Sequence, residues 1–293
     1  MRLFLISALI LSAFLFCQPL CFGNAKSKDG DLTIQVGDIR MAYHMYGSGD
    51  PLVMIMGYGS TMNLWESRLI ELLSSRFQVI LFDHRGIGDT ETGQRPFTIE
   101  QFADDTAGLL QALGIKKAHL LGWSMGGLIA QETALRHSSV VNKLVLYAAH
   151  CNAGMFPPAP QVIQKLTDTS GTPEEQGMRF ISLLFPPAWL QTQGQRVKEI
   201  FFRPLGKTPP ETMAKQSQAI DQWKGCCDRL GSLTHPTLVM AGAEDQIVPP
   251  QNARFLAEKI PNARLILFEK TGHGLMFQDP EGFGKTVIDF LKN

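Results

Sequence analysis

The feature that most constrains the fold of this chain is a Gly-x-Ser-x-Gly motif between an expected strand and an expected helix. The apolar run Ala118 to Leu121 predicts the strand, and the run Leu128 to Arg136 predicts the helix. Gly122 and Gly126 flank Ser124, and their lack of a side chain leaves room for neighbouring elements at a sharp turn. The pattern predicts a nucleophile elbow. The alternative is a glycine-rich turn with an incidental serine.

Met125 follows the serine and falls in the first turn of the expected helix. Its backbone N–H and the positive end of the helix would both point to where an oxyanion forms. A second glycine-rich loop, Gly57 to Ser60, follows the apolar run Pro51 to Met56. Continuous apolarity indicates a strand buried on both faces of a parallel sheet, and such sheets place their sites at the carboxyl ends of strands.

Strands and helices alternate through most of the chain. This order predicts an α/β fold with a mostly parallel, doubly wound sheet, and an antiparallel hairpin at one edge. The core is expected over residues 31–150 and 233–293. Besides the segments already named, the expected strands are Leu32 to Val36, Ile39 to Tyr46, Gln78 to Phe82, Lys143 to Ala148, Thr237 to Ala241 and Arg264 to Phe268, and the expected helices are Leu64 to Ser75, Ile99 to Leu113, Ala253 to Ile260 and Pro280 to Leu291.

The alternation stops over residues 151–232, where three proline pairs interrupt short helical patterns. A run of small helices between two α/β halves predicts an inserted helical cap over the strand ends. Its expected helices are Gln161 to Thr167, Glu174 to Leu184, Gln195 to Phe201 and Glu211 to Gln222.

Two further residues have the chemistry that a serine nucleophile needs. An alcohol is a weak nucleophile near neutral pH, so Ser124 requires a base, and the base requires a carboxylate. Asp245 lies just past the strand Thr237 to Ala241, and His273 lies in a glycine-flanked loop after the last strand. His150, which also follows a strand, is the competing histidine, and we expect it to line the substrate pocket instead.

With these motifs in place, the chain from about Ile39 onward resembles the α/β-hydrolase superfamily. The resemblance is carried by the Gly57 to Gly59 and Asp83 to Gly88 loops, the elbow, and the Asp245 and His273 loops, in the order Ser, Asp, His. The family often has histidine where this chain has Met56, a histidine that supports the oxyanion loop. The Asp83 to Gly88 loop is expected to have a structural role beside the elbow.

The resemblance implies a serine hydrolase that acts on esters through an acyl-enzyme on Ser124, and the many aromatic residues of the expected cap favour small to medium apolar carboxylic esters. The backbone N–H groups of Tyr58 and Met125 would hold the oxyanion, and neither a metal nor another cofactor is implied. The alternatives within the same fold are a lactonase, a carbon–carbon bond hydrolase and a cofactor-free haloperoxidase or perhydrolase, and outside catalysis a binding module. Trp123, His150, Trp189 and Trp223 are the candidate pocket residues.

The N-terminus predicts a signal peptide over residues 1–25. Arg2 precedes an apolar run from Leu3 to Phe16, and small residues at Gly23 and Ala25 suit cleavage. We expect an exported protein, periplasmic or secreted, without stable membrane association after cleavage; the alternative is a retained N-terminal anchor. The 27 basic residues balance the 27 acidic ones, so nothing in the net charge favours nucleic acid, and a small-molecule ester is the expected partner.

Three of the five cysteines lie beyond the expected signal peptide. In an exported protein they predict one disulfide, between Cys151 and either Cys226 or Cys227, and one free thiol. The alternative is three small buried apolar side chains.

Overall fold

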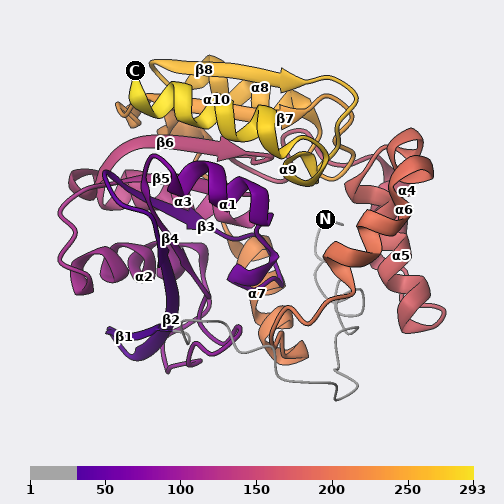
Figure 1. Cartoon of the computed structure of the whole chain (residues 1–293), viewed down its shortest axis with the longest axis horizontal. Coiled ribbons are helices and arrows are strands. Elements are labelled where there is room, and N and C mark those ends of the chain that lie inside the picture. The colour runs from indigo at the N-terminus through magenta and orange to yellow at the C-terminus, as the bar shows by residue number, and fades with distance from the viewer. Residues whose placement is uncertain (1–31) are drawn as a thin grey trace.

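The computed structural model describes residues 32–293, which form one eight-stranded sheet with helices on both faces (Figure 1). The strand order is β1-β2-β4-β3-β5-β6-β7-β8. All neighbouring pairs from β4 to β8 are parallel, whereas β1 and β2 pair antiparallel and lie at one edge. The predicted α/β class and the edge hairpin are therefore confirmed. The strands are β1 Leu32–Val36, β2 Ile39–Tyr46, β3 Pro51–Ile55, β4 Gln78–Phe82, β5 Ala118–Trp123, β6 Val141–Tyr147, β7 Thr237–Gly242 and β8 Ala263–Phe268.

The two faces of the sheet carry separate apolar cores because helices cover each face. One core includes Leu109, Ile129 and Leu256, which come from three different helices. The other includes Leu69 and Phe283. The helices of the first face are α2 Ile99–Ala112, α3 Met125–Arg136 and α8 Pro250–Lys259, and those of the second are α1 Ser67–Ser74, α9 Leu275–Gln278 and α10 Pro280–Lys292.

Four helices lie between β6 and β7, in the segment 151–232, which we call the cap. Figure 1 shows α4, α5 and α6 gathered to one side of the sheet, with α7 between them and the strands. The arrowheads of β6 and β8 point to that side, so the cap lies at the carboxyl ends of the parallel strands. Each cap helix begins at a proline, whose fixed φ and missing N–H suit the first turn. The helices are α4 Pro160–Thr167, α5 Pro173–Leu184, α6 Pro187–Phe201 and α7 Pro210–Gln222.

A disulfide joins the two ends of the cap. Cys151 and Cys227 are bonded, with their Cα atoms 5.0 Å apart, and they are 76 positions apart in the sequence. Within residues 32–293 the remaining cysteine is Cys226, which is buried and donates its S–H to Gln131 Oε1 at 3.3 Å. Of the two pairings expected from the sequence, the structure therefore has the one with Cys227.

The signal-peptide prediction falls on residues outside the described part of the chain. Between residues 32 and 293, no helix has the length and apolar character needed to cross a membrane.

Candidate active site

Ser124 lies at the tip of a sharp turn between β5 and α3, at the centre of the sheet. Its φ of 55° and ψ of −118° place a non-glycine residue in a region that side chains rarely adopt. The flanking glycines are required by the packing: a Cβ on Gly122 would collide with the carbonyl oxygen of Gly126, and one on Gly126 would collide with that of Ile55. The geometry is that of a nucleophile elbow, with the backbone strain found at many functional sites.

Asp245 and His273, from loops after β7 and β8, form a hydrogen-bonded pair. His273 Nδ1 lies 2.8 Å from Asp245 Oδ2, and both side chains are almost fully buried. The other carboxylate oxygen accepts the backbone N–H groups of Ile247 at 2.9 Å and Val248 at 2.8 Å. A carboxylate in this position fixes the proton on Nδ1, which leaves Nε2 as the basic atom of the ring.

The His273 loop is held by side chains of the core. The His273 carbonyl accepts the Tyr147 hydroxyl at 2.5 Å and the Trp123 indole N–H at 3.2 Å. Gln278 accepts the backbone N–H of the adjoining Gly272 at 2.7 Å. Because Trp123 directly precedes Ser124, these contacts set the histidine beside the elbow.

The loop of residues 57–60, which we call the oxyanion loop, lies against the elbow. A Cβ on Gly57 would come within 3.5 Å of Ser124 Cβ and 3.3 Å of the Trp123 carbonyl oxygen. Met125 is the first residue of α3, and the first N–H groups of a helix have no partner within it. The structure thus packs Gly57 against Ser124 and places Met125 directly after it at the start of α3, and Tyr58 adjoins Gly57 in the chain.

A buried histidine supports the oxyanion loop from another position than in the family pattern. His84, just past β4, places Nε2 3.0 Å from the carbonyl oxygen of Met56. That carbonyl can only accept, so Nε2 carries the proton, and burial lowers the pKa of His84, which keeps the ring neutral. The preceding residue, Asp83, accepts the Met62 N–H at 2.6 Å. The Asp83 to Gly88 loop thus has the structural role expected from the sequence, since its side chains bond the backbone of Met56 and Met62.

His150 lies beside the Asp245–His273 pair, past the carboxyl end of β6. Its ring faces Trp223 with 6.2 Å between centroids, and Gln131 donates to its backbone carbonyl at 3.0 Å. Burial and, to a smaller extent, the neighbouring His273 lower the pKa of His150 to about 4, so the ring is neutral near pH 7. Its Nδ1 is buried and has no hydrogen-bond partner within residues 32–293.

Two groups of aromatic residues of the cap lie near the candidate site. Trp189 stacks on Phe185 at 4.5 Å, and Phe185 also contacts Phe201 and, in the core, Phe277. A Cβ on Gly274, next to His273, would collide with the Phe185 ring, so this group lies against the catalytic loop. Trp189 is thus part of an aromatic core shared by the cap and the sheet domain.

The second group lies at the neck of the cap. The Trp223 indole N–H donates to Glu132 Oε1 at 2.9 Å, and Glu132 also pairs with Arg229 at 2.5 Å. Glu132 is on α3, eight positions after Ser124, and it is fully buried. Trp223 therefore lies between His150 and the buried carboxylate of Glu132, and among the candidate pocket residues Trp223 and His150 lie together.

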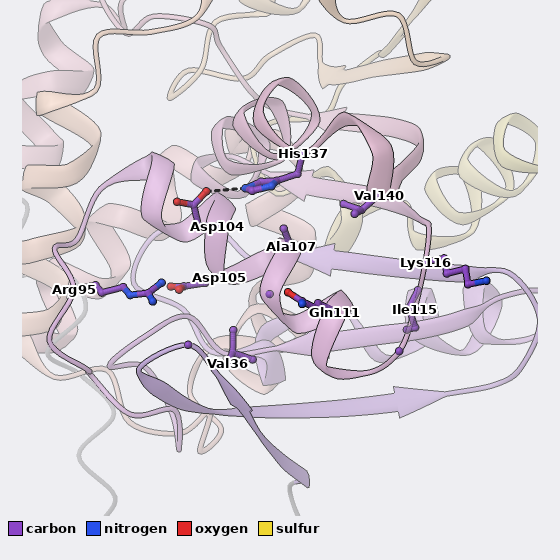
Figure 2. A pocket seen from close by; sticks show the side chains of 13 residues that line it. Val36, Arg95, Asp104, Asp105, Ala107, Gln111, Ile115, Lys116, His137 and Val140 are labelled. Carbon is purple, nitrogen blue, oxygen red and sulfur yellow. Dashed lines mark hydrogen bonds and ion pairs between the residues drawn. The ribbon is translucent and has the colours of Figure 1, made fainter.

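A separate pocket of about 620 Å³ lies at the opposite edge of the sheet (Figure 2). Its lining includes Ile115 and Lys116, which precede β5, and His137 and Val140, which precede β6. The candidate catalytic residues, in contrast, follow their strands. Figure 2 shows Asp104 turned toward His137, and the two are 2.7 Å apart. This pocket is distinct from the elbow.

In the described part of the chain, no three His, Cys, Asp or Glu side chains are grouped to hold a metal ion.

The family model for the alpha/beta hydrolase fold matches residues 50–280. The chain belongs to this family. It is 30% identical over 272 residues to the "putative carbamate hydrolase RutD" of a Caulobacter species, covering 88% of this chain and 98% of that one. A solved hydrolase from Pseudomonas aeruginosa superposes with a TM-score of 0.78 at 26% identity, over 91% of this chain and all of the other. An esterase from Exiguobacterium antarcticum gives 0.75 at 27%, over 90% and 100%. The protein is a hydrolase of the α/β-hydrolase family.

Three residues around the site were not expected from the sequence: Tyr147, Gln278 and Gln216. Each bonds a backbone atom of the His273 loop or the oxyanion loop, and Gln216 does so from the cap, since its Oε1 accepts the Gly59 N–H at 2.8 Å. A polar residue within an apolar strand is the signal that marks Tyr147, whereas the two glutamines carry no distinguishing pattern.

Proposed function

We propose that this hydrolase cleaves small to medium, uncharged carboxylic esters through an acyl-enzyme on Ser124. The observation that carries the proposal is the Asp245–His273 pair, buried beside a serine on a strained elbow. In the first step His273 Nε2 takes the hydroxyl proton as Ser124 Oγ attacks the ester carbonyl. The negative charge on the carbonyl oxygen is then held by the backbone N–H groups of Tyr58 and Met125.

The second half of the reaction repeats the same proton transfers. His273 gives its proton to the leaving alkoxide, and the alcohol departs. Water then loses a proton to His273 and attacks the acyl carbonyl, and the carboxylic acid leaves as Ser124 Oγ regains a proton. Asp245 stays ionised and offsets the charge of the imidazolium.

Apolar cap residues support the choice of substrate. Phe185 lies against the His273 loop, and Trp223 lies against His150, so both aromatic groups of the cap adjoin the catalytic residues. Burying a charged substrate group there without a partner would cost several kcal/mol, whereas each buried methylene contributes about 0.8 kcal/mol. Short and medium acyl chains should therefore react better than charged ones.

A carbamate is the second candidate substrate class, because the relatives at 29 to 30% identity carry the name putative carbamate hydrolase. A carbamate also has a carbonyl that a serine can attack, and the same oxyanion hole would serve it. The resulting carbamoyl-enzyme holds a nitrogen on the acyl carbon and needs polar contacts that an alkyl ester does not. His150 Nδ1 is a buried polar atom near the site that could make such a contact.

The test is kcat/KM for p-nitrophenyl esters of two to eight acyl carbons, measured beside p-nitrophenyl N-alkyl carbamates of matched length. We expect the esters to react faster, with an optimum at intermediate length, and Ser124→Ala to remove turnover. Higher kcat/KM for every carbamate would replace the ester assignment with the carbamate one. Undiminished turnover by Ser124→Ala would refute the serine mechanism.

We also infer that the protein is exported, with a mature N-terminus at Lys26 or Asn24. The basic start with its apolar run supports this, and so does the Cys151–Cys227 disulfide, because structural disulfides persist in oxidising compartments. Mass spectrometry of the extracytoplasmic fraction tests it. Intact Met1 on a cytoplasmic protein would contradict it.

A further inference from the structure

The oxyanion loop is held from two sides, and one of them is the cap. On the core side, His84 fixes the carbonyl of Met56. On the cap side, Gln216 accepts the N–H of Gly59 at 2.8 Å, and the Thr61 hydroxyl donates to the carbonyl of Leu205. The loop that would bind the oxyanion is therefore one of the places where the cap is hydrogen-bonded to the sheet domain.

The two bonds nearest Tyr58 act on the peptide groups on either side of its N–H. The Met56 carbonyl belongs to the peptide group between residues 56 and 57. The Gly59 N–H belongs to the peptide group between residues 58 and 59. The Tyr58 N–H lies in the peptide group between them, and Gly59 has a φ of +66°, a conformation that favours glycine. Fixing both flanking peptide planes leaves the middle one few orientations.

Gln216 is fully buried on α7, and only half of its amide is satisfied. Its Oε1 is used by Gly59, while Nε2 is buried and has no hydrogen-bond partner within residues 32–293. A buried donor without a partner costs folding free energy, and an apolar side chain of similar length would avoid that cost. Packing therefore does not explain why residue 216 is a glutamine. The hydrogen bond that its Oε1 accepts from Gly59 does explain it.

We propose that Gln216 is a positioning residue of the oxyanion hole, through which the cap fixes the Tyr58 N–H in its catalytic orientation. The inference rests on the proposed function, because the proposed function is what assigns oxyanion binding to this loop. It also means that the oxyanion hole is complete only when α7 is seated on the loop, so the cap takes part in catalysis as well as in covering the substrate.

Gln216→Met tests this, because methionine has nearly the same length and no strong acceptor. Gln216→Glu keeps the acceptor, and Gln218→Met is the matched control because Gln218 is exposed on the same helix. We measure kcat and KM on p-nitrophenyl acetate, the melting temperature and the pH–rate profile. Loss of one oxyanion donor lowers kcat by about 100- to 1,000-fold. Misplacing such a donor should cost less, so we expect a fall of about 10- to 100-fold for Gln216→Met.

A positioning role predicts that the fall is in kcat, with the melting temperature and the pH–rate profile unchanged, and that Gln216→Glu recovers most of the rate. Wild-type kcat in Gln216→Met would overturn the proposal, as would equal losses in the Met and Glu variants. The labelling rate of Ser124 by a fluorophosphonate probe is compared in the same variants, since it needs the oxyanion hole but no particular substrate. Failure of the ester assignment would leave the labelling difference intact, whereas failure of this inference would remove it.

Discussion

The two halves of the candidate active site are held in different ways. The carbonyl of His273 is fixed by Tyr147 and Trp123, both from central strands, and Asp245 is fixed by N–H groups of its own loop. The oxyanion loop is held partly by the cap, through Gln216. The cap also bonds the His273 loop, but through backbone atoms, since the Gly274 N–H donates to the Leu184 carbonyl at 2.9 Å. The comparison teaches that side chains of the sheet domain fix the acid–base half, whereas the electrostatic half depends on a side chain of the cap.

The largest expected effect comes from removing the base on the sheet side. His273→Ala should lower kcat by at least about 10,000-fold, because Ser124 then has no group to take its proton. The cap should stay seated, so its resistance to limited proteolysis should match that of the wild-type protein. Turnover within about tenfold of wild type would show that the acid–base half does not depend on this histidine.

Next in size is the loss of the covalent tie at the neck of the cap. Cys151→Ser should lower the free energy of unfolding by about 2 to 4 kcal/mol, because the Cys151–Cys227 bond closes a long loop. Cys226→Ser is the control, since Cys226 is outside the disulfide. Urea unfolding measures both. If the two variants lose the same stability, the disulfide does not stabilise the neck.

His150 lies where the two halves meet, and it should make the protein sensitive to acid. Its pKa is about 4 when folded, against an ordinary value of 6.5. Above pH 6.5 the His150 imidazole is neutral in both the folded and the unfolded state. As the pH falls toward 4, the unfolded chain binds a proton at His150 that the folded protein does not, so the free energy of unfolding falls. Between pH 7 and pH 4.5 the free energy of unfolding should therefore fall by on the order of 2 to 3 kcal/mol less in His150→Gln than in the wild-type protein.

Urea unfolding of both proteins at the two pH values checks this prediction. His84 and His119, whose pKa values are also lowered by burial, remain in the variant, so the difference between the proteins isolates His150. An equal loss of stability on acidification in both would contradict burial of a neutral imidazole at this position.

The smallest effect is expected from Tyr147→Phe. The His273 carbonyl would keep the Trp123 N–H, so one neutral hydrogen bond is lost, which is worth about 1 kcal/mol. We expect kcat to fall about 3- to 10-fold, with the KM unchanged. A fall as large as that of His273→Ala would mean that the core holds this histidine through Tyr147 alone.

The sequence allowed the sheet domain and the three candidate catalytic residues to be predicted for a physical reason. Strands such as β3, β5 and β7 are buried on both faces and are therefore mostly apolar runs, and each candidate catalytic residue lies in the turn or loop that follows a strand. The cap helix α6 was predicted only over its second part, because Gln193, with a φ of −118° and a ψ of 19°, interrupts it with a kink.

The supporting contacts could not be predicted because they join distant parts of the chain. Tyr147 and His273 are 126 positions apart, and Gly59 and Gln216 are 157 apart. Both bonds end on backbone atoms, which every residue has, so no pattern of side chains marks them. The sequence also could not predict whether Cys226 or Cys227 pairs with Cys151, because the pairing depends on which of the two adjacent side chains faces Gln131.

The disulfide turns the cap into a covalent ring attached to the sheet by a single crosslinked neck. A protease cut anywhere between residues 152 and 226 would open this ring without dividing the molecule. The cut protein would migrate as one species in denaturing conditions and separate into two fragments only after reduction. For the same reason the cap is a suitable place for new chain ends in a circular permutant, since the crosslink would keep both halves of the cap near the site they cover.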